Sequence, residues 1–464
     1  MLAQAPVTEL LDSAAAAHPD RTALVHADER ISYAELAERV ERAAGALAVA
    51  PGDAVGLVLP NGPEFVVAFL AILRAGAVAV PLNPAFKQAE REFHFRESGV
   101  AAVVTEEPAG GGAAPAVARD ADADAVFQYS SGSTGRPKRV PRTHAQLRAE
   151  VDAYVRATGM GPGDVVFCAI PLHHTYGMGC CLLASVHAGS TLVLFDQPSP
   201  LVLQRGRALE LIERERATVF PAVPYTFRLL ADAPEGGDLS SLRLCISAAA
   251  KLPRATLRAF EGRFRVPVRE LYGCTEAGAV TVDMSARPEP GSVGLPLDGV
   301  EVRIVGAEGE LLDTGRVGEI HFRGPGMTAG YAGPGDLNRD AFRDGFFASG
   351  DRGRLDDEGR LHVTGREKLL IDVRGDKVDP IEVEDVLAVH PKVEQVVVVG
   401  VPSDADGEEH VKAVVVPAGE CGERELIRYC RERLADYKVP ARVEFRDEIP
   451  LSAAGKVLRK YLLD

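Results

Sequence analysis

A block of small polar residues in the first third of the chain carries the strongest chemical signal. The nine residues that follow Tyr129 are all Ser, Gly, Thr, Arg, Pro or Lys. Glycines in such a block allow positive φ angles and close approach of the backbone. Backbone N–H groups, hydroxyls and a lysine ammonium can together surround a polyphosphate. The predicted phosphate loop comprises Ser130, Ser131, Gly132, Ser133, Thr134, Gly135 and Lys138.

A flexible surface turn is the ordinary alternative for a Ser/Gly cluster. The embedded Arg-Pro-Lys and the short apolar run before the block favour a binding loop here. A Walker A loop is excluded, because Gly-x-x-x-x-Gly-Lys-[Ser/Thr] occurs nowhere in the chain.

Two acidic residues stand close to glycines later in the chain. In Tyr272-Gly-Cys-Thr-Glu276 we expect the glycine to end a strand over 266–271, which exposes the Thr275 hydroxyl beside the Glu276 carboxylate. A carboxylate next to a triphosphate requires a cation, which predicts Mg²⁺ at Glu276. Asp351, in a glycine-flanked turn, can accept two hydrogen bonds from a vicinal diol such as that of ribose.

Two basic motifs complete the set. Arg366 and Lys368 form a basic pair, and Lys456 lies in a turn of small residues near the C-terminus. Taken singly, each motif has a structural alternative: Asp351 as a turn residue, Lys456 as a solvated charge, and Thr275-Glu276 as a helix start.

Alternating helical and strand patterns must hold these motifs in place. Their alternation indicates a mostly parallel sheet with helices on both faces. The Gly-, Pro- and Asp-rich stretch 107–125 should be a loop. We expect helices over 33–47 and 64–74, and strands over 54–59, 77–81, 99–105, 165–170, 191–195, 218–223 and 242–247.

The pattern changes after about residue 290. Short strands with close turns predict a small antiparallel β-lobe, and a compact α+β unit follows it. The lobe strands are expected over 300–305, 318–323 and 361–364, and the last unit over a hairpin (369–373, 377–378), helices 380–389 and 423–434, and strands 395–400 and 411–416. The predicted domains are residues 1–367 and 368–464.

Composition excludes several classes of protein. The 464 residues include 52 Lys+Arg and 67 Asp+Glu, a net charge of −15, which is too acidic for a protein that coats nucleic acid or an anionic membrane. No apolar run approaches the ~20 residues of a membrane span, and the N-terminus shows no secretory signal. The seven cysteines include no Cys-x-x-Cys pair, so neither a disulfide framework nor a zinc site is predicted. We expect a cytoplasmic protein, monomeric or homodimeric, that binds no nucleic acid.

In this order and at these separations, the motifs resemble those of the adenylate-forming superfamily. Its members include acyl- and aryl-CoA synthetases, adenylation domains of nonribosomal peptide synthetases, and beetle luciferases. The resemblance spans nearly the whole chain, with further matches at 31–36, 81–84 and 318–331. It implies an α/β fold with a large N-terminal domain of layered sheets plus a β-lobe, and a small mobile C-terminal α+β domain.

The resemblance also implies a role for each motif. Besides the phosphate loop, the ATP site would include Ala249, Ala250, Tyr272 on the adenine, Asp351 on the ribose, and Arg366. Thr275 would contact the α-phosphate, Glu276 would hold Mg²⁺, and Lys456 would bridge the substrate carboxylate and the α-phosphate. Lys368 would be the hinge between the domains, and Gly375 would line the tunnel for the thiol.

The segment 171–177 resembles the family segment that borders the acyl pocket. His174, which we also place among the catalytic residues, stands where amino-acid-activating domains usually carry an Asp for the substrate ammonium. An acid without an α-amine is therefore expected. Small apolar walls favour an aryl or short-to-medium aliphatic acid, and the predicted pocket residues are His174, Met178, Gly179, Ala222, Val223, Ala248, Cys274 and Gly278.

The implied reaction joins a carboxylic acid to AMP with release of pyrophosphate, and then transfers the acyl group to a thiol. Both reactants are anionic, so catalysis depends on positioning and on the positive charge of Mg²⁺, Lys456 and the phosphate loop. The thiol is that of CoA or of the phosphopantetheine on an acyl or peptidyl carrier protein. The alternatives are a stand-alone amino-acid-type enzyme that loads a carrier protein, transfer to a non-thiol acceptor, and a non-catalytic nucleotide-binding relative.

Three residues depart from the family pattern. Arg139 and Ala248 replace usual glycines, and Lys251 replaces a usual proline. Arg139 would either add charge near the phosphates or point to solvent. Ala248 would narrow the acyl pocket.

Overall fold

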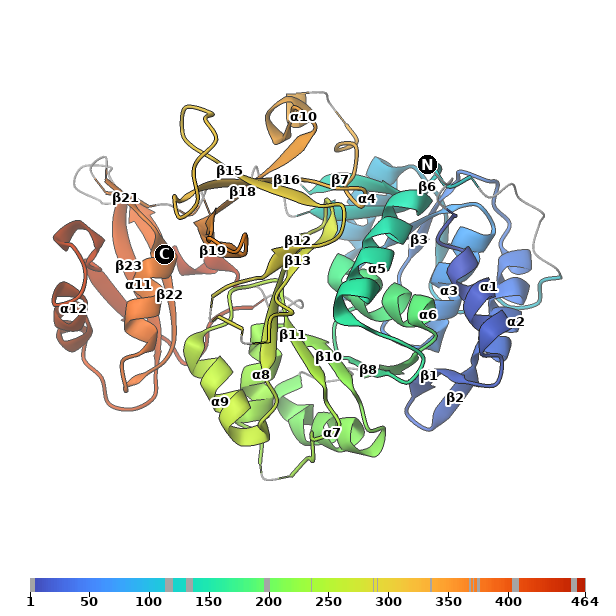
Figure 1. The fold of residues 1–464 in the computed structure, drawn as a ribbon, viewed down its shortest axis with the longest axis horizontal. Helices are drawn as coiled ribbons and strands as arrows, with labels where there is room; N and C mark the ends of the chain where they lie inside the picture. The colour runs from blue at the N-terminus through green and yellow to red at the C-terminus, as the bar shows by residue number, and fades with distance from the viewer. Residues whose placement is uncertain are drawn as a thin grey trace.

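The computed structural model describes residues 5–112, 120–130, 137–195, 201–234, 236–286, 288–289, 291–333, 336–366, 369, 371–373, 376–402, 409–451 and 457–463. Two large, mainly parallel sheets form the body of the molecule, and helices lie on both faces of each (Figure 1). Among the described residues, no helix is long and apolar enough to cross a membrane.

The first sheet carries the predicted phosphate loop between its last two strands. Its strand order is β5-β3-β4-β6-β7, parallel except for the β6–β7 hairpin. Helix α4 covers its outer face through Phe95. The bounds are β3 Ala54–Leu57, β4 Val78–Pro81, β5 Val100–Val104, β6 Asp124–Ser130, β7 Lys138–Thr143 and α4 Gln88–Ser98.

The second sheet has nine strands in the order β14-β13-β12-β11-β10-β8-β9-β1-β2. Its inner strands are parallel, and antiparallel hairpins close both edges. Helices α7, α8 and α9 pack on its outer face around Phe220 and Phe227. The bounds are β1 Thr22–His26, β2 Glu29–Ser32, β8 Val165–Cys168, β9 Thr191–Leu194, β10 Val219–Ala222, β11 Leu244–Ser247, β12 Val268–Cys274, β13 Gly278–Val282, β14 Leu295–Pro296, α7 Leu201–Arg214, α8 Pro224–Ala231 and α9 Arg254–Phe264.

A shared apolar core fills the space between the two sheets. Helix α3 (Pro63–Arg74) lies within this core, and every residue from Phe65 to Leu73 is buried. A helix that is apolar on all sides must be buried in this way. The other elements of this layer are α1 Glu9–Ala17, α2 Tyr33–Ala46, α5 His144–Thr158, the π-helix η1 Gly177–Leu183 and α6 Ala184–Ala188.

The predicted β-lobe is an antiparallel sheet beside the nucleotide-binding motifs. Its strand order is β15-β16-β18-β17, with β19 paired to β18. The bounds are β15 Glu301–Val305, β16 Gly318–Arg323, α10 Asp336–Ala341, β17 Phe342–Arg343, β18 Phe346–Leu355 and β19 Leu361–Arg366.

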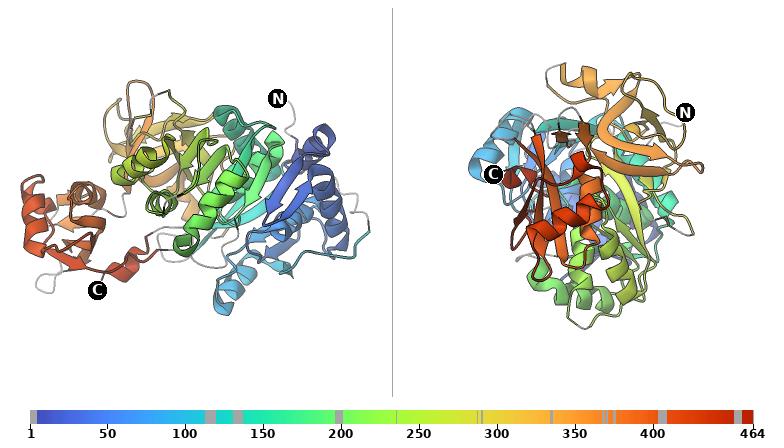
Figure 2. Two further views of the ribbon diagram at one scale, coloured as in Figure 1. Left: turned by 90° about the horizontal axis from the view of Figure 1, so that it is seen from below. Right: turned by 90° about the vertical axis from the view of Figure 1, so that its left-hand side faces the viewer.

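The C-terminal unit lies at one end of the molecule (Figures 1 and 2). A sheet of β22, β23 and β24 packs against α11 and α12 on one face and against η4 on the other. An ion pair between Lys251 Nζ and Asp385 Oδ2, 2.6 Å apart, joins this unit to the body. The bounds are β20 Ile371–Val373, β21 Asp376–Val378, α11 Pro380–Ala388, β22 Val393–Pro402, β23 Glu409–Pro417, α12 Glu423–Arg431, η3 Asp436–Lys438, β24 Arg442–Phe445 and η4 Arg459–Leu462.

These observations confirm the predicted fold class of layered α/β sheets, a β-lobe and a small α+β unit. Most predicted helices and strands are present, with ends that shift by a few residues. The domain boundary stays a prediction, and residues 367 and 368 lie outside the described residues.

Candidate active site

Four of the predicted acyl pocket residues lie at one edge of the nine-stranded sheet: Ala222, Val223, Ala248 and Cys274. Parallel strands β10, β11 and β12 all end there, and such carboxyl edges are where ligands bind in α/β sheets. Ala222 lies opposite Ser247 in register, and the Ala248 amide donates to the Ala222 carbonyl at 3.2 Å. Val223 and Cys274 are the neighbouring strand ends, whereas Ala249 and Ala250 follow β11 at the surface.

The strand before Glu276 is longer than predicted. Strand β12 runs through Gly273 to Cys274, so the expectation that Gly273 ends a strand at 271 is wrong. A Cβ on Gly273 would lie 2.2 Å from the Gly278 carbonyl oxygen, so the glycine is needed for close pairing with β13. The turn falls instead at 275–277, and it presents Thr275 and Glu276 from the tip of a hairpin.

Tyr331 brings Glu276 and the predicted phosphate loop together. Its hydroxyl donates to Glu276 Oε1 at 2.7 Å, and Lys138 Nζ lies 4.4 Å from the centre of its ring. Ser130 pairs with Lys138 across the β6–β7 hairpin, so both ends of the loop start beside this cluster. Burial and the nearby negative charge of Glu276 raise the pKa of Tyr331, which keeps the phenol a hydrogen-bond donor.

Asp351 lies within strand β18, not in a turn as predicted. Tyr272 donates from its hydroxyl to Asp351 Oδ2 at 2.7 Å, and Arg366, opposite on β19, donates from Nε to Oδ1 at 2.5 Å. The carboxylate is buried, yet its second lone pairs remain for a diol. The structure therefore brings the predicted adenine, ribose and arginine residues into one cluster.

The segment that carries His174 leads into a π-helix, η1, which contains Met178 and Gly179. π-Helices are rare and are frequent at functional sites. A Cβ on Gly177 would lie 2.4 Å from the Pro171 carbonyl oxygen, so the helix starts tightly against the preceding turn. Burial lowers the pKa of His173, the neighbour of His174, to about 3, which keeps that imidazole neutral.

Sequence reasoning missed several residues of this region. Thr175 donates to Gln128 Oε1 at 2.8 Å, which links the acyl segment to strand β6. The buried pair Arg142–Glu150 was also missed, because nothing in the sequence marks two charged residues as partners. Tyr331 was within reach, since it ends the recognised 318–331 segment.

Arg139 does not point to solvent, which was one of its two predicted positions. Its guanidinium lies 4.9 Å from the centre of the Phe127 ring, its Nη1 donates to the Glu97 carbonyl at 3.1 Å, and its Nε lies 3.6 Å from Glu97 Oε1. The side chain therefore packs against helix α4 and is half-buried there.

Several predicted site residues lie outside the described residues: Ser131, Gly132, Ser133, Thr134, Gly135, Lys368, Gly375 and Lys456. The chain on either side of Lys456 is described. Leu451 and Val457 form an antiparallel bridge, and Arg459 Nη2 pairs with Glu384 Oε1 on α11 at 2.8 Å. The lysine segment therefore starts and ends at fixed points of the C-terminal unit.

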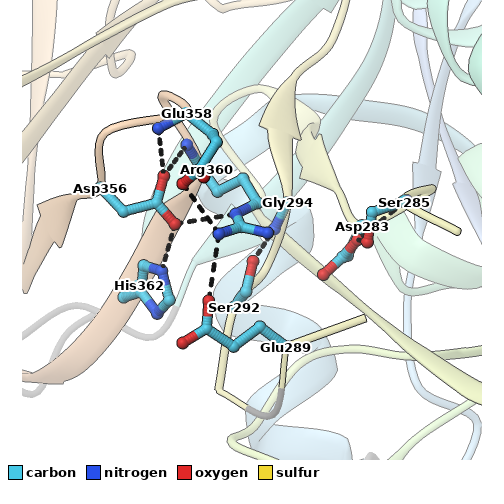
Figure 3. Close-up of polar contacts among 9 residues, drawn as sticks. All are labelled: Asp283, Ser285, Glu289, Ser292, Gly294, Asp356, Glu358, Arg360 and His362. Carbon is cyan, nitrogen blue, oxygen red and sulfur yellow. Dashed lines mark hydrogen bonds and ion pairs between the residues drawn. The ribbon is translucent and has the colours of Figure 1, made fainter. Parts of the chain in front are cut away.

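Within the described part of the chain, one cluster has metal-ligand composition: Glu289, Asp356 and His362 (Figure 3). Arg360 already occupies its centre, with Nε 2.8 Å from Asp356 Oδ2 and Nη2 3.1 Å from Glu289 Oε2. Burial raises the pKa of Asp356, but hydrogen bonds from His362 and Arg360 outweigh it and hold that pKa below its usual range. The cluster is an ion-pair network rather than a cation site.

Comparison with known proteins identifies the family. The family model described as AMP-binding enzyme matches residues 11–122 and 106–332, and that of the AMP-binding enzyme C-terminal domain matches 382–456. An oxalate–CoA ligase of Arabidopsis thaliana is 34% identical, with 97% of this chain and 96% of that protein aligned. A feruloyl-CoA synthase of an Amycolatopsis species is 35% identical, with 95% of each chain aligned.

Solved structures agree. ATP-bound MatB from Rhodopseudomonas palustris superposes with a TM-score of 0.90 at 30% identity, over 98% of each chain. O-succinylbenzoate coenzyme A synthetase from Bacillus subtilis, in complex with ATP and magnesium ion, gives 0.86 at 30% identity, over 98% of this chain and 99% of that one. The chain therefore belongs to the AMP-binding enzyme family and is an AMP-forming acid–CoA ligase.

Proposed function

We propose that this ligase activates an aryl or short-to-medium aliphatic carboxylic acid that lacks an α-amine, and transfers it to CoA. ATP, Mg²⁺ and CoA are the cofactors of such a ligase. The observation that carries the proposal is that Tyr331 contacts both Glu276, through its hydroxyl, and Lys138, through its ring, although the two residues are distant in sequence. A cation and a buried carboxylate around one tyrosine side chain suit a magnesium-bound triphosphate.

Each cluster has its own task in this proposal. Asp351, oriented by Tyr272 and Arg366, accepts hydrogen bonds from the ribose hydroxyls. Glu276 holds Mg²⁺, Thr275 contacts the α-phosphate, and the loop from Ser130 to Lys138 surrounds the outer phosphates. Ala249 and Ala250 border the adenine.

The substrate carboxylate is itself the nucleophile, so no side-chain base is required. What the chain supplies is alignment of two anions and positive charge where negative charge builds up. Lys456 provides that charge between the carboxylate and the α-phosphate. Thiol transfer then follows with the C-terminal domain turned about Lys368, so that Gly375 lines the path of the pantetheine arm.

Two observations support the acid class. The acyl segment carries His174 where an aspartate for a substrate ammonium would stand, and the strand ends around it are small and apolar. The names of the compared relatives, oxalate–CoA ligase and feruloyl-CoA synthase, also refer to acids without an α-amine. Both names also refer to CoA, which favours CoA over a carrier protein as the acceptor.

A panel of carboxylic acids scored by acid-dependent pyrophosphate release tests the proposal. Product analysis with CoA, with a carrier protein and without thiol then identifies the acceptor. Release with α-amino acids alone, or product that forms only with a carrier protein, would contradict it.

Lys456→Ala separates the two half-reactions. We expect adenylation to fall at least a hundredfold, as for loss of one group that stabilises the transition state, while thioester formation from pre-made acyl-adenylate falls far less. An equal loss in both would remove Lys456 from the proposed role.

A further inference from the structure

A buried ion pair lies behind the predicted acyl pocket. Arg142, on β7, places Nη2 2.8 Å from Glu150 Oε2 on α5, and the two side chains are 0% and 1% exposed. Burying two charges is expensive, and an apolar pair of the same volume usually serves stability as well or better. Stability alone therefore gives a weak account of this pair.

The Glu150 carboxylate fits where two pocket glycines lack side chains. A Cβ on Gly179 would lie 2.6 Å from Glu150 Oε1, and one on Gly278 would lie 2.0 Å from it. The Ala279 amide donates to the same oxygen at 3.2 Å. Helix α5 runs beside the β12–β13 hairpin (Figure 1). In that hairpin the carboxylate abuts Gly278, which is two residues from Glu276.

The pair leaves hydrogen-bonding groups unused. Among the described residues, Arg142 Nε and Nη1 have no hydrogen-bond partner. Glu150 Oε2 lies at ion-pair distance from Arg142 but accepts no well-aligned hydrogen bond. Buried donors and acceptors are seldom left in this state, because the loss of their water is then uncompensated. The site thus offers two donor nitrogens and one acceptor oxygen, with no net charge.

We propose that Arg142 and Glu150 are specificity-determining residues at the end of the acyl pocket, and that they select an acid with an uncharged hydroxyl remote from its carboxylate. This inference rests on the proposed function. A hydroxyl can donate to Glu150 and accept from Arg142. A second carboxylate would face Glu150 and an ammonium would face Arg142, so both are disfavoured by the neutral pair.

The test compares acids that differ by one hydroxyl. Benzoate is paired with 3- and 4-hydroxybenzoate, and butyrate with 4-hydroxybutyrate, with isophthalate as the dicarboxylate. For the wild type we expect kcat/KM for the best hydroxy acid to exceed that of its parent at least tenfold, and that of isophthalate by more. A site built for a substrate hydroxyl rejects the analogue that lacks it in this way.

The double variant R142M/E150L removes both charges and leaves no lone buried charge. We expect the ratio between hydroxy acid and parent acid to fall to about one, with the KM for ATP unchanged. Thermal unfolding checks that the variant is folded. If R142M/E150L is not folded, the variant R142Q/E150Q is measured instead. The kcat/KM ratio between hydroxy acid and parent acid should then fall at least threefold, because charge-assisted hydrogen bonds are lost.

The outcomes separate the two proposals. An equal loss for both members of each pair, or a wild-type preference for the parent acid or for isophthalate, would overturn the inference and leave the proposed function standing. No pyrophosphate release with any acid would overturn the proposed function and this inference with it.

Discussion

Two tyrosines connect the predicted motifs. Tyr331 donates its hydroxyl to Glu276 in the β12–β13 hairpin, and its ring lies beside Lys138 at the end of the predicted phosphate loop. Tyr272, in β12, donates to Asp351 in the β-lobe. Each phenol is an uncharged donor to a buried carboxylate, so it orients the carboxylate without neutralising it. In the proposed function, this fixed orientation aims the free lone pairs of Glu276 at Mg²⁺ and those of Asp351 at the ribose hydroxyls.

Replacement of Tyr331 by phenylalanine tests this orientation. A hydrogen bond to a charged group contributes more than a neutral one, so we expect Y331F to lower kcat/KM for adenylation about tenfold. The dependence on Mg²⁺ concentration should shift upward, because Glu276 loses its donor. Y461F, at a tyrosine that is 53% exposed, is the control and should match the wild type. Unchanged Mg²⁺ dependence in Y331F would contradict the proposed role of Glu276.

Backbone strain is present at Ala249, beside the proposed adenine site. Its φ of 71° lies in the left-handed region that disfavours residues with a Cβ. We expect A249G to raise the free energy of unfolding by about 1 kcal/mol, because glycine adopts this conformation without a steric penalty. A250G, at a residue without a positive φ, should instead lower it. Denaturant unfolding of both variants measures the difference, and equal effects would disprove the strain.

At the scale of elements, the site is assembled from strand ends and hairpins. The β6–β7 hairpin carries the phosphate loop, the β12–β13 hairpin carries Glu276, and π-helix η1 starts beside the strand ends of the acyl pocket. The segment with Lys456 is held in the same manner, by the Leu451–Val457 bridge and by Glu384 of α11. Glu384 also accepts from the Val398 amide at 2.8 Å, which ties α11 to β22.

We therefore expect Glu384 to act as a positioning residue for the lysine segment. Burial raises its pKa although Arg459 opposes the shift. We expect E384Q to lower pyrophosphate release about tenfold, since the ion pair to Arg459 is lost, with the KM for ATP unchanged. Thioester formation from pre-made acyl-adenylate should fall less, because in the proposed function Lys456 acts in the first step only. E382Q, on the same helix but in a more exposed pair with Lys438, is the matched control. Equal loss in both steps would indicate a general structural role.

At the scale of the whole molecule, contacts between the body and the C-terminal unit are polar. Lys251 pairs with Asp385, and Arg228 lies 3.8 Å from Glu394. Exposed pairs of this kind contribute little to stability, which suits the domain rotation that the proposed function requires. Lys251 departs from the usual proline at this position, and the structure assigns its ammonium to this contact.

The pH dependence of stability should report on Glu270, which lies in β12 close to Lys251. Burial raises its pKa to about 7, against the Leu252 and Gly291 amides that lower it. Because the folded pKa exceeds the unfolded value, this contribution to stability is complete below the unfolded pKa and is lost as pH rises through about 7. The loss by pH 8 is up to about 3 kcal/mol.

E270Q removes this titration. We expect the variant to exceed the wild type in free energy of unfolding at pH 8 and to approach it near pH 5, as measured by urea unfolding across that range. E308Q, at an exposed turn, should leave the wild-type pH profile intact. A constant difference between E270Q and the wild type at all pH values would show that Glu270 does not titrate there.

By itself, the sequence determined the family, the α/β layers and the motif residues, because these depend on local composition and on the periodicity of apolar residues. Tyr272, Asp351 and Arg366 were named as parts of one site through the family resemblance of their motifs. The tertiary structure decided which groups meet. It placed Asp351 within a strand, turned Arg139 toward Glu97, and paired Arg142 with Glu150 between two glycines. Such contacts depend on strand register and on the packing of distant segments, and no local pattern of residue types records either.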